Sequence, residues 1–268
     1  MITFREFLLV KGLTPVTVDN HINTIKRVRG VIGKFNHNNT TKYIAQFYDS
    51  GYSYSHKTQT AKGIEYYMEY KDNPIYFGRQ KRPNTIIKDT LTEGEITSMF
   101  LSCKNTREKA ILSLLAYSGL RNKEIRNLKT SDVDTCKNKV RVIKGKGEYD
   151  GISYITPECS KIINNYLYEY PRKNEDFLFT TLIRGNKLGS HDLRKWIKIF
   201  ASRANINKRV YPYLLRHSLA TSMLLRGADI WAIKQQLRHR FISSTMVYIY
   251  SVGFGERNDY EKFAPSYL

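Results

Sequence analysis

The first part of the chain, up to about residue 77, carries apolar side chains at the three- and four-residue spacing of amphipathic helices. Thr14-Pro15 is typical of a helix start, because proline suits the first helical turn. The stretch 16–32 that follows has apolar residues at helical spacing: Val18, Ile22, Ile25 and Val28. Residues 41–48 and 56–68 show a similar pattern. We therefore predict a helical domain over residues 1–77.

Residues 78–89 form the next segment and are basic, with glycine and proline. Such a composition predicts a linker. The linker could be a solvated loop, or it could lie along a phosphate backbone. The sequence does not separate these two interpretations.

From residue 90 onward the pattern changes to helices with a short β-like insert. Thr92 and Glu95 have the spacing of a capping box, and an apolar helix over 110–117 ends at Ser118-Gly119. Residues 139–143 alternate in polarity, and 152–155 could return beside them as a second strand. The predicted fold is thus mainly α with a small β-sheet, with a second domain over 90–268.

The charge of the chain narrows its partners. Lysine and arginine total 44 against 24 aspartate and glutamate, which gives a net charge of +20. Such an excess favours a polyanionic partner, and nucleic acid fits best. A membrane surface is the rival, but no apolar run approaches the roughly 20 residues that span a bilayer. The apolar run 7–10 is also too short for a signal-peptide core.

The three cysteines do not indicate a metal or disulfide site. Cys103, Cys136 and Cys159 are odd in number and widely spaced, so neither a zinc pattern nor a disulfide framework can be built from them. We therefore interpret the three cysteines as reduced thiols of an intracellular protein.

Two segments in the first half of the second domain could bind or protonate a phosphate group. Arg121 follows Gly119 at the end of the apolar helix, and Glu124 three residues later could hold its side chain. An arginine fixed in this way can grip two phosphate oxygens, although an ordinary solvated ion pair would look the same. Lys146 lies between two glycines and could donate a proton, or it could be an exposed turn residue. Neighbouring Lys144 leaves the choice of lysine open.

Two further segments lie near the end of the chain. Tyr213, Arg216 and His217 lie on the first turns of a predicted helix, where positive groups suit an anion. His239 follows the end of the next helix, and Tyr248 lies nine positions beyond it. Taken singly, these residues could equally belong to a charged helix surface or to a core.

In order along the chain, these segments resemble the active-site pattern of the tyrosine recombinases, the phage integrase and Xer-type enzymes. The stretch 118–128, SGLRNKEIRNL, looks like the box of the first arginine. The stretch 214–239 looks like the second arginine box continued to the second histidine. The nine-residue step from His239 to Tyr248 is the family's spacing to its nucleophile, whereas Tyr250 has the wrong offset and ranks second. The resemblance fits an Xer-like enzyme of archaeal, viral or plasmid origin.

The resemblance implies roles for these residues. Arg121 and Arg216, helped by His239, would stabilise the phosphate charge, Tyr248 would attack, and Lys146 would protonate the leaving oxygen, with Glu124 and His217 in support. It also implies an N-terminal helical, SAM-like core-binding domain, a 3′-phosphotyrosyl intermediate, no metal or cofactor, and a homotetramer on two DNA sites in a prokaryotic cytoplasm. Tyr213 departs from the pattern, which has histidine there, and a phenol cannot be cationic. That departure puts the rate and pH profile in doubt.

Three other functions remain open from the sequence. A non-catalytic DNA-binding protein would share the charge without needing Tyr248, and a type IB topoisomerase would use similar chemistry without exchanging partners. An RNA-binding protein would explain the charge but not the ordered segments. The tail 256–268 could pack on a neighbouring subunit or fold back on its own domain. The target site, and the choice among integration, excision and dimer resolution, are not encoded in any pattern we can read.

Overall fold

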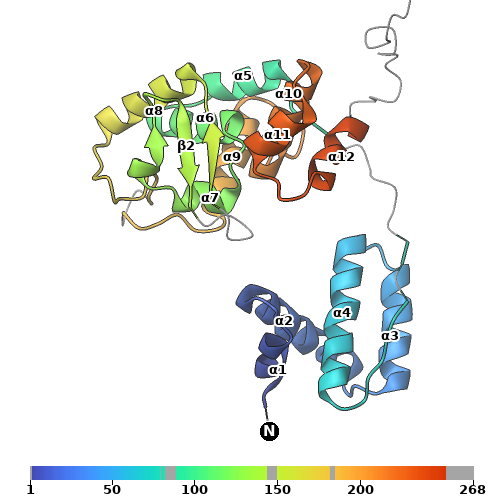
Figure 1. Ribbon diagram of the computed structural model, residues 1–268. Coiled ribbons are helices and arrows are strands. Elements are labelled where there is room, and N and C mark those ends of the chain that lie inside the picture. The colour runs from blue at the N-terminus through green and yellow to red at the C-terminus, as the bar shows by residue number, and fades with distance from the viewer. Residues whose placement is uncertain (1, 79, 82–88, 144–149, 182–184, 252–268) are drawn as a thin grey trace, which may run out of the picture. The chain divides into compact units, whose positions relative to one another are not determined.

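The computed structural model of the protein describes residues 2–78, 80–81, 89–143, 150–181 and 185–251 (Figure 1). The chain divides into two compact units, Met1–Ile86 and Ile87–Leu268, and each is described by itself. Both are mainly helical and the second also contains a small sheet, so the predicted fold class is confirmed. Across the described residues, none of the helices is long and apolar enough to cross a membrane.

Unit 1 contains four helices in its described part: α1 (Phe4–Val10), α2 (Pro15–Ile32), α3 (His37–Asp49) and α4 (Tyr54–Tyr70). Each helix follows a residue whose side-chain oxygen accepts a hydrogen bond from a first-turn amide: Thr3, Thr14, Asn36 and Ser53. The three stretches with apolar spacing are all helical. The sequence analysis missed α1, because its seven residues include a single buried side chain, Leu8, and so show no periodicity.

The core of unit 1 lies mainly between α2, α3 and α4. It is formed by Ile25, Val28, Ile44, Ala61, Ile64, Tyr67 and Met68. Helices α2 and α4 approach closely at Gly63, where an added Cβ would lie 2.8 Å from Nδ1 of His21. The cationic side chains of Lys26, Arg27 and Arg29 on α2 stay exposed. Unit 1 therefore buries its apolar residues and leaves these charges at the surface.

Unit 2 is built around α6 (Thr106–Tyr117), whose side chains are buried on most sides. Its other described helices are α5 (Glu93–Leu101), α7 (Asn122–Asn127), α8 (Pro157–Glu169), α9 (Asp192–Arg203), α10 (Pro212–Leu225), α11 (Ile230–Leu237) and α12 (Ser243–Ser251). The predicted capping box of Thr92 and Glu95 is present at the start of α5. Because α6 packs against both α8 and α10, it links the two halves of this unit.

A three-stranded antiparallel sheet completes unit 2. Strands β1 (Val133–Asp134), β2 (Lys139–Val142) and β3 (Gly151–Tyr154) lie in the order β1-β2-β3, after a short 3-10 helix, Thr130–Asp132. The predicted pairing of the second and third strands is present, with Val140 opposite Ser153. The predicted turn between them, including Lys146, lies outside the described residues.

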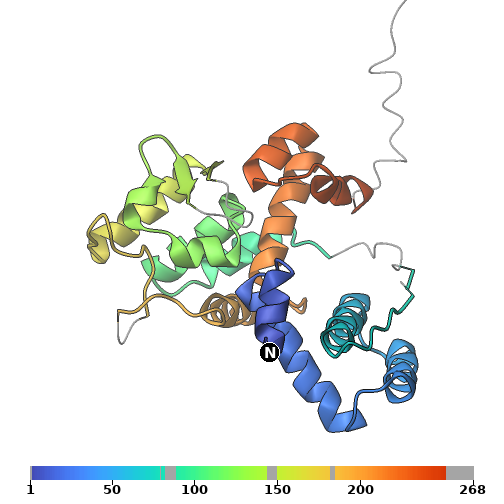
Figure 2. The same cartoon turned by 60° about the horizontal axis from the view of Figure 1, so that its bottom comes forward.

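Helices α10, α11 and α12 form a group at one side of unit 2 in both views (Figures 1 and 2). A small apolar cluster holds them together: Ala220, Leu224, Ile233, Leu237 and Tyr248. This cluster positions the segments that carry the predicted site residues.

Candidate active site

The end of α6 leads through a tight turn to Arg121. Gly119 in this turn has a φ of +63°, and a Cβ at this position would lie 2.8 Å from Cδ2 of Leu237. Glycine is the residue that tolerates both the backbone conformation and the close approach. The Gly119 carbonyl accepts a hydrogen bond from Nη1 of Arg216. The turn thus joins the start of α7 to α10 and to the end of α11.

Arg121 is the N-cap residue of α7, and Glu124 in the first turn holds it at two points. One carboxylate oxygen of Glu124 accepts from the Arg121 amide and the other from its Nη1, both at 2.7 Å. Burial raises the pKa of Glu124, but the charges of Arg238 and Arg121 and their hydrogen bonds outweigh it and lower the pKa overall. The predicted ion pair is therefore present, and its arginine keeps 27% of its side chain exposed.

Arg216 on α10 is buried, with 2% of its surface exposed. Besides its bond to the Gly119 carbonyl, it donates Nη2 to the carbonyl of Leu237 at 2.6 Å. Burial, together with the charges of Arg121 and Arg238, lowers the pKa of Arg216 to about 10. The guanidinium is still charged at neutral pH, so two backbone carbonyls hold a buried cation in a fixed orientation.

Tyr248 on α12 lies with 1% of its surface exposed, in the cluster that joins α10, α11 and α12. Its ring lies 5.0 Å from that of His217 and 6.2 Å from that of His239, which is nearly parallel to it. Burial raises the pKa of Tyr248 to about 12, as does the neighbouring Tyr213, whereas the charge and hydrogen bonding of Arg216 lower it. The phenol is therefore protonated at neutral pH and lies next to the buried arginine.

His239 follows α11, and its Nδ1 lies 2.8 Å from Oγ1 of buried Thr245. Burial and the charges of Arg216 and Arg121 lower the pKa of His239 to about 4. The imidazole is therefore neutral at pH 7. If the Thr245 hydroxyl donates to Nδ1, the proton of the ring resides on Nε2, which is then a hydrogen-bond donor.

Tyr213 and His217 stack one turn apart on α10, with ring centroids 6.5 Å apart and an interplanar angle of 10°. His217 is buried, whereas Tyr213 is 48% exposed. Through His217 the stack continues to Tyr248. The phenol of Tyr213, which stands where the family pattern has histidine, thus lies at the edge of the cluster. There it contributes to the environment of Tyr248.

Three candidates from the sequence lie wholly or partly outside the described residues. Lys146 and Lys144 fall in residues 144–149, outside the described residues, although the flanking strands β2 and β3 are described. The backbone of Tyr250 belongs to α12, but its side chain is also outside the described part. The remaining candidates, Arg121, Glu124, Tyr213, Arg216, His217, His239 and Tyr248, are brought together in one region by α7, α10, α11 and α12.

No group of three histidine, cysteine, aspartate or glutamate side chains that could hold a metal ion occurs among the described residues. The acid–base and charged groups of the cluster are thus arginine, histidine, tyrosine and one glutamate.

Comparison with known proteins gives the family of the chain. Residues 89–252, more than half of the chain, match the profile of the phage integrase family. The chain belongs to this family.

Curated and solved relatives of this integrase-family chain agree with that assignment. A tyrosine recombinase of Pseudothermotoga lettingae is 32% identical over 193 residues, which cover 72% of this chain and 64% of the relative. The crystal structure of XerA recombinase superposes with a TM-score of 0.59 at 27% identity, over 98% of this chain and 97% of that one. The Tn1549 transposon integrase, solved in complex with circular intermediate DNA, gives a TM-score of 0.69 at 15% identity, over 92% and 94%, and shows the shared fold.

Two residues of the integrase-family site were missed by the sequence analysis. Arg238 donates Nη2 to Glu124 at 2.7 Å, so the carboxylate lies between two arginines. Gln236 bonds to the backbone of Tyr154 in β3 and to the carbonyl of Ser118, and so ties α11 to the sheet and to the end of α6. Neither could be found from spacing alone, because their partners are more than 80 residues away. The signal available in the sequence was that two basic residues, Arg238 and His239, follow each other directly.

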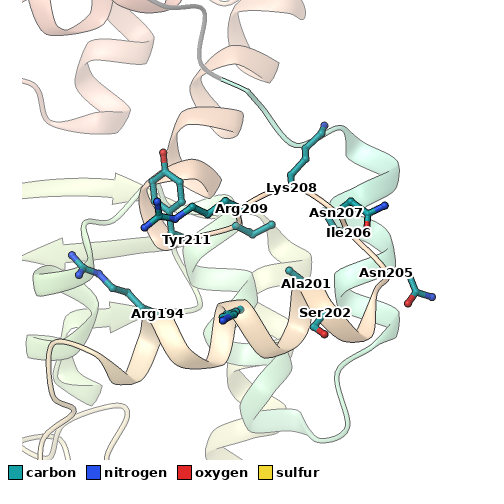
Figure 3. A pocket seen from close by; sticks show the side chains of 11 residues that line it. Arg194, Ala201, Ser202, Asn205, Ile206, Asn207, Lys208, Arg209 and Tyr211 are labelled. Carbon is teal, nitrogen blue, oxygen red and sulfur yellow. The ribbon is translucent and has the colours of Figure 1, made fainter. Parts of the chain in front are cut away.

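A hollow of about 800 Å³ lies between α9 and the loop that leads into α10 (Figure 3). Four basic side chains line it, Arg194, Lys198, Lys208 and Arg209, and Tyr211 at the start of α10 closes one end. Figure 3 shows Arg194 and Arg209 on the same side of the hollow. Lys208 is held by Glu95 at 2.9 Å and by the carbonyl of Thr90 at 3.0 Å. The hollow is suited to an anionic chain.

Proposed function

We propose that this integrase-family chain is a tyrosine recombinase that performs site-specific DNA strand exchange. Tyr248 attacks a phosphodiester, and the cut strand is kept as a 3′-phosphotyrosyl ester until another strand end displaces it. The observation that carries the proposal is the buried Tyr248 phenol beside the fixed cation Arg216, with Arg121 and His239 in the same cluster. The profile match across the second unit supports it.

The proposed chemistry needs no group beyond the chain's own side chains. Attack forms the bond from the Tyr248 oxygen to phosphorus and breaks the bond to the 5′ oxygen, while charge builds on the non-bridging oxygens. Arg216 and the exposed part of Arg121 offset this charge, and the Nε2 proton of His239 adds a neutral donor. Because the pKa of Tyr248 is about 12, the phenol is protonated before attack, and its proton passes to solvent water as the new bond forms.

The leaving 5′ oxygen requires a proton, and we assign this role to Lys146, with Lys144 as the alternative. Both lie outside the described residues, so the assignment rests on the sequence pattern. Tyr213 stands where the family pattern has histidine. Its proposed role is to hydrogen-bond at the edge of the site, next to Tyr248, without carrying charge.

The two units divide the work in this proposal. Residues 1–77 would grip double-stranded DNA through exposed cations such as Lys26 and Arg27, and residues 78–89 would link them to a catalytic domain over 90–268. The basic hollow between α9 and α10 would take the phosphate backbone near the cleaved bond. The Tn1549 transposon integrase, which shares this fold, was solved in complex with circular intermediate DNA, and this supports DNA as the proposed partner.

The proposed working assembly is a homotetramer on two DNA sites in a prokaryotic cytoplasm. Exchange of two strands between two duplexes requires four nucleophiles if each chain supplies one. The alignment covers 64% of the bacterial tyrosine recombinase, so the activity of the whole relative is carried over here as a proposal.

The first experiment traps the covalent intermediate. Wild type and Tyr248→Phe are incubated with nicked duplexes that carry candidate sites, and the denatured products are run on a gel. We expect a slower protein band with wild type and none with Tyr248→Phe, while both bind DNA equally. A band that persists in Tyr248→Phe would reject Tyr248 as the nucleophile and make Tyr250 the next residue to replace.

A second assay separates the remaining functions. Two differently labelled duplexes are mixed, and a recombinase joins one label to the other. Relaxation of supercoils without joined products would indicate a topoisomerase instead. Tight binding with no covalent band on any site would contradict an enzymatic role and favour a DNA-binding protein.

A further inference from the structure

We propose that Arg238 is a positioning residue for Arg121: it neutralises Glu124 and fixes the carboxylate, so that the Arg121 guanidinium remains available to the scissile phosphate. The inference deepens the proposed function and rests on it. It concerns a residue that would not itself touch the DNA.

The backbone at Arg238 is the first observation. This residue ends α11 in the left-handed conformation, with φ 52° and ψ 50°, which L side chains other than asparagine and aspartate rarely adopt. Glycine would adopt this conformation without strain. An arginine kept at such a position indicates that its side chain has a task that outweighs the backbone cost.

The contacts of the side chain show what that task is. Nη2 of Arg238 donates to Oε2 of Glu124 at 2.7 Å, and 11% of the Arg238 side chain is exposed against 5% for Glu124. The aliphatic part lies against strand β3, since a Cβ added to Gly151 would come within 2.7 Å of its Cδ. The guanidinium is therefore held between the sheet and the carboxylate.

Charge explains why a second arginine is required. A buried carboxylate with a single partner would bind Arg121 as a closed ion pair and cancel most of its charge. With Arg238 present, Arg121 and Arg238 share the single negative charge of Glu124. The three side chains together therefore keep a net positive charge that can attract a phosphate. Arg121 uses Nη1 for Glu124 and places Nη2 3.4 Å from the Arg238 carbonyl, a weak contact, so most of its donors have no partner among the residues that the structure describes.

The matched control is Arg226, which ends α10 as Arg238 ends α11. Arg226 also pairs with a glutamate, Glu93, at 2.5 Å, but 71% of its side chain is exposed. The two variants Arg238→Gly and Arg226→Gly make the same chemical change at helix ends, and in Arg238→Gly the backbone strain is relieved. Relief of this strain offsets part of the stability that is lost with the bond to Glu124.

The test measures single-turnover cleavage of a nicked duplex at saturating DNA, with DNA affinity measured separately. We expect Arg238→Gly to cleave about tenfold to a hundredfold more slowly with affinity changed less than threefold, and Arg226→Gly to match wild type. Arg238→Lys should recover part of the rate, because it restores the charge but not the planar fork. Equal rates in Arg238→Gly and wild type would overturn the proposal.

Two readouts separate positioning from a merely structural role. In a Glu124→Gln background, where no charge needs neutralising, Arg238→Gly should cause less than a threefold further loss. The acid limb of the pH–rate profile should also move to higher pH in Arg238→Gly, because Arg238 is one of the cations that keep the pKa of His239 low. Full additivity of the two substitutions, with an unmoved profile, would show that Arg238 only stabilises the fold. Absence of a covalent band in wild type would instead contradict the proposed function.

Discussion

Units 1 and 2 place their positive charge in opposite ways. Helix α2 of unit 1 carries Lys26, Arg27 and Arg29 at the surface, over a core of aliphatic and aromatic residues. Unit 2 buries Arg216 next to Tyr248 and holds most of Arg238 out of solvent against Glu124. Exposed cations lose little hydration and give affinity for any polyanion, whereas a buried guanidinium is costly unless fixed acceptors hold it. The contrast teaches that net charge indicates binding, and that burial of charge indicates chemistry.

The largest effect is expected from replacing the buried cation of unit 2. Arg216→Ala should slow cleavage about a thousandfold or more, because the developing phosphate charge loses its fixed cation. The carbonyls of Gly119 and Leu237 also lose their donor, which should lower the free energy of unfolding by about 1–3 kcal/mol. Single-turnover cleavage and urea denaturation measure the two quantities. A variant that keeps a tenth of the wild-type rate would show that buried charge is not decisive here.

Replacing the exposed cations of unit 1 is expected to have a smaller effect, and on DNA affinity instead of the cleavage rate. The pair Lys26→Ala and Arg27→Ala should weaken DNA binding about tenfold at moderate salt and reduce the salt slope of log K by up to about two. The cleavage rate at saturating DNA should stay as in wild type. As a control, exchanging the two residues (Lys26→Arg with Arg27→Lys) preserves both charges and should leave the slope unchanged. Slower cleavage by the variant with Lys26→Ala and Arg27→Ala would show that unit 1 contributes to the chemistry as well as to binding.

The smallest effect concerns the neutral group among the cations. The pKa of His239 is about 4 in the folded chain, below the ordinary 6.5, so between these values the unfolded chain binds a proton that the folded chain does not. Stability from this group is complete above pH 6.5 and is lost as the pH falls towards 4. We expect His239→Gln to remove about 1 kcal/mol of this acid sensitivity, allowing for solvent screening of a half-buried ring. Denaturation curves of wild type and His239→Gln at pH 7 and 4.5 test this prediction. An equal loss of unfolding free energy in the two proteins would contradict the lowered pKa of His239.

Much of the local structure was predictable because it depends on neighbouring residues. Thr14 before Pro15, and Thr92 with Glu95, mark helix starts through hydrogen bonds three residues apart, and both starts are present. The hairpin of β2 and β3 followed from alternating polarity. Helix α1 was missed because it is too short to show a period, and the two-residue strand β1 is shorter than any pattern.

The sequence predicted which candidate residues should lie together, but it did not predict the contacts between them. Order and spacing pointed to Arg121, Arg216 and Tyr248, which do lie in one cluster. Arg238 was missed as part of that cluster, since its strained backbone and its bond to Glu124 arise from contact between segments 114 residues apart. Shifts such as that of His239 depend on burial, which no local pattern gives.

The bonds that hold the two arginines also set when the site can exist during synthesis. Arg216 reaches Gly119 across 97 residues, and Arg238 reaches Glu124 across 114. Contacts between such distant positions close late, because a long loop must be ordered first. A growing chain on the ribosome therefore completes unit 1 and α6 well before Tyr248 has even been made. Under the proposed function, a half-finished molecule that meets DNA would hold it through unit 1 but would lack the nucleophile for cutting it.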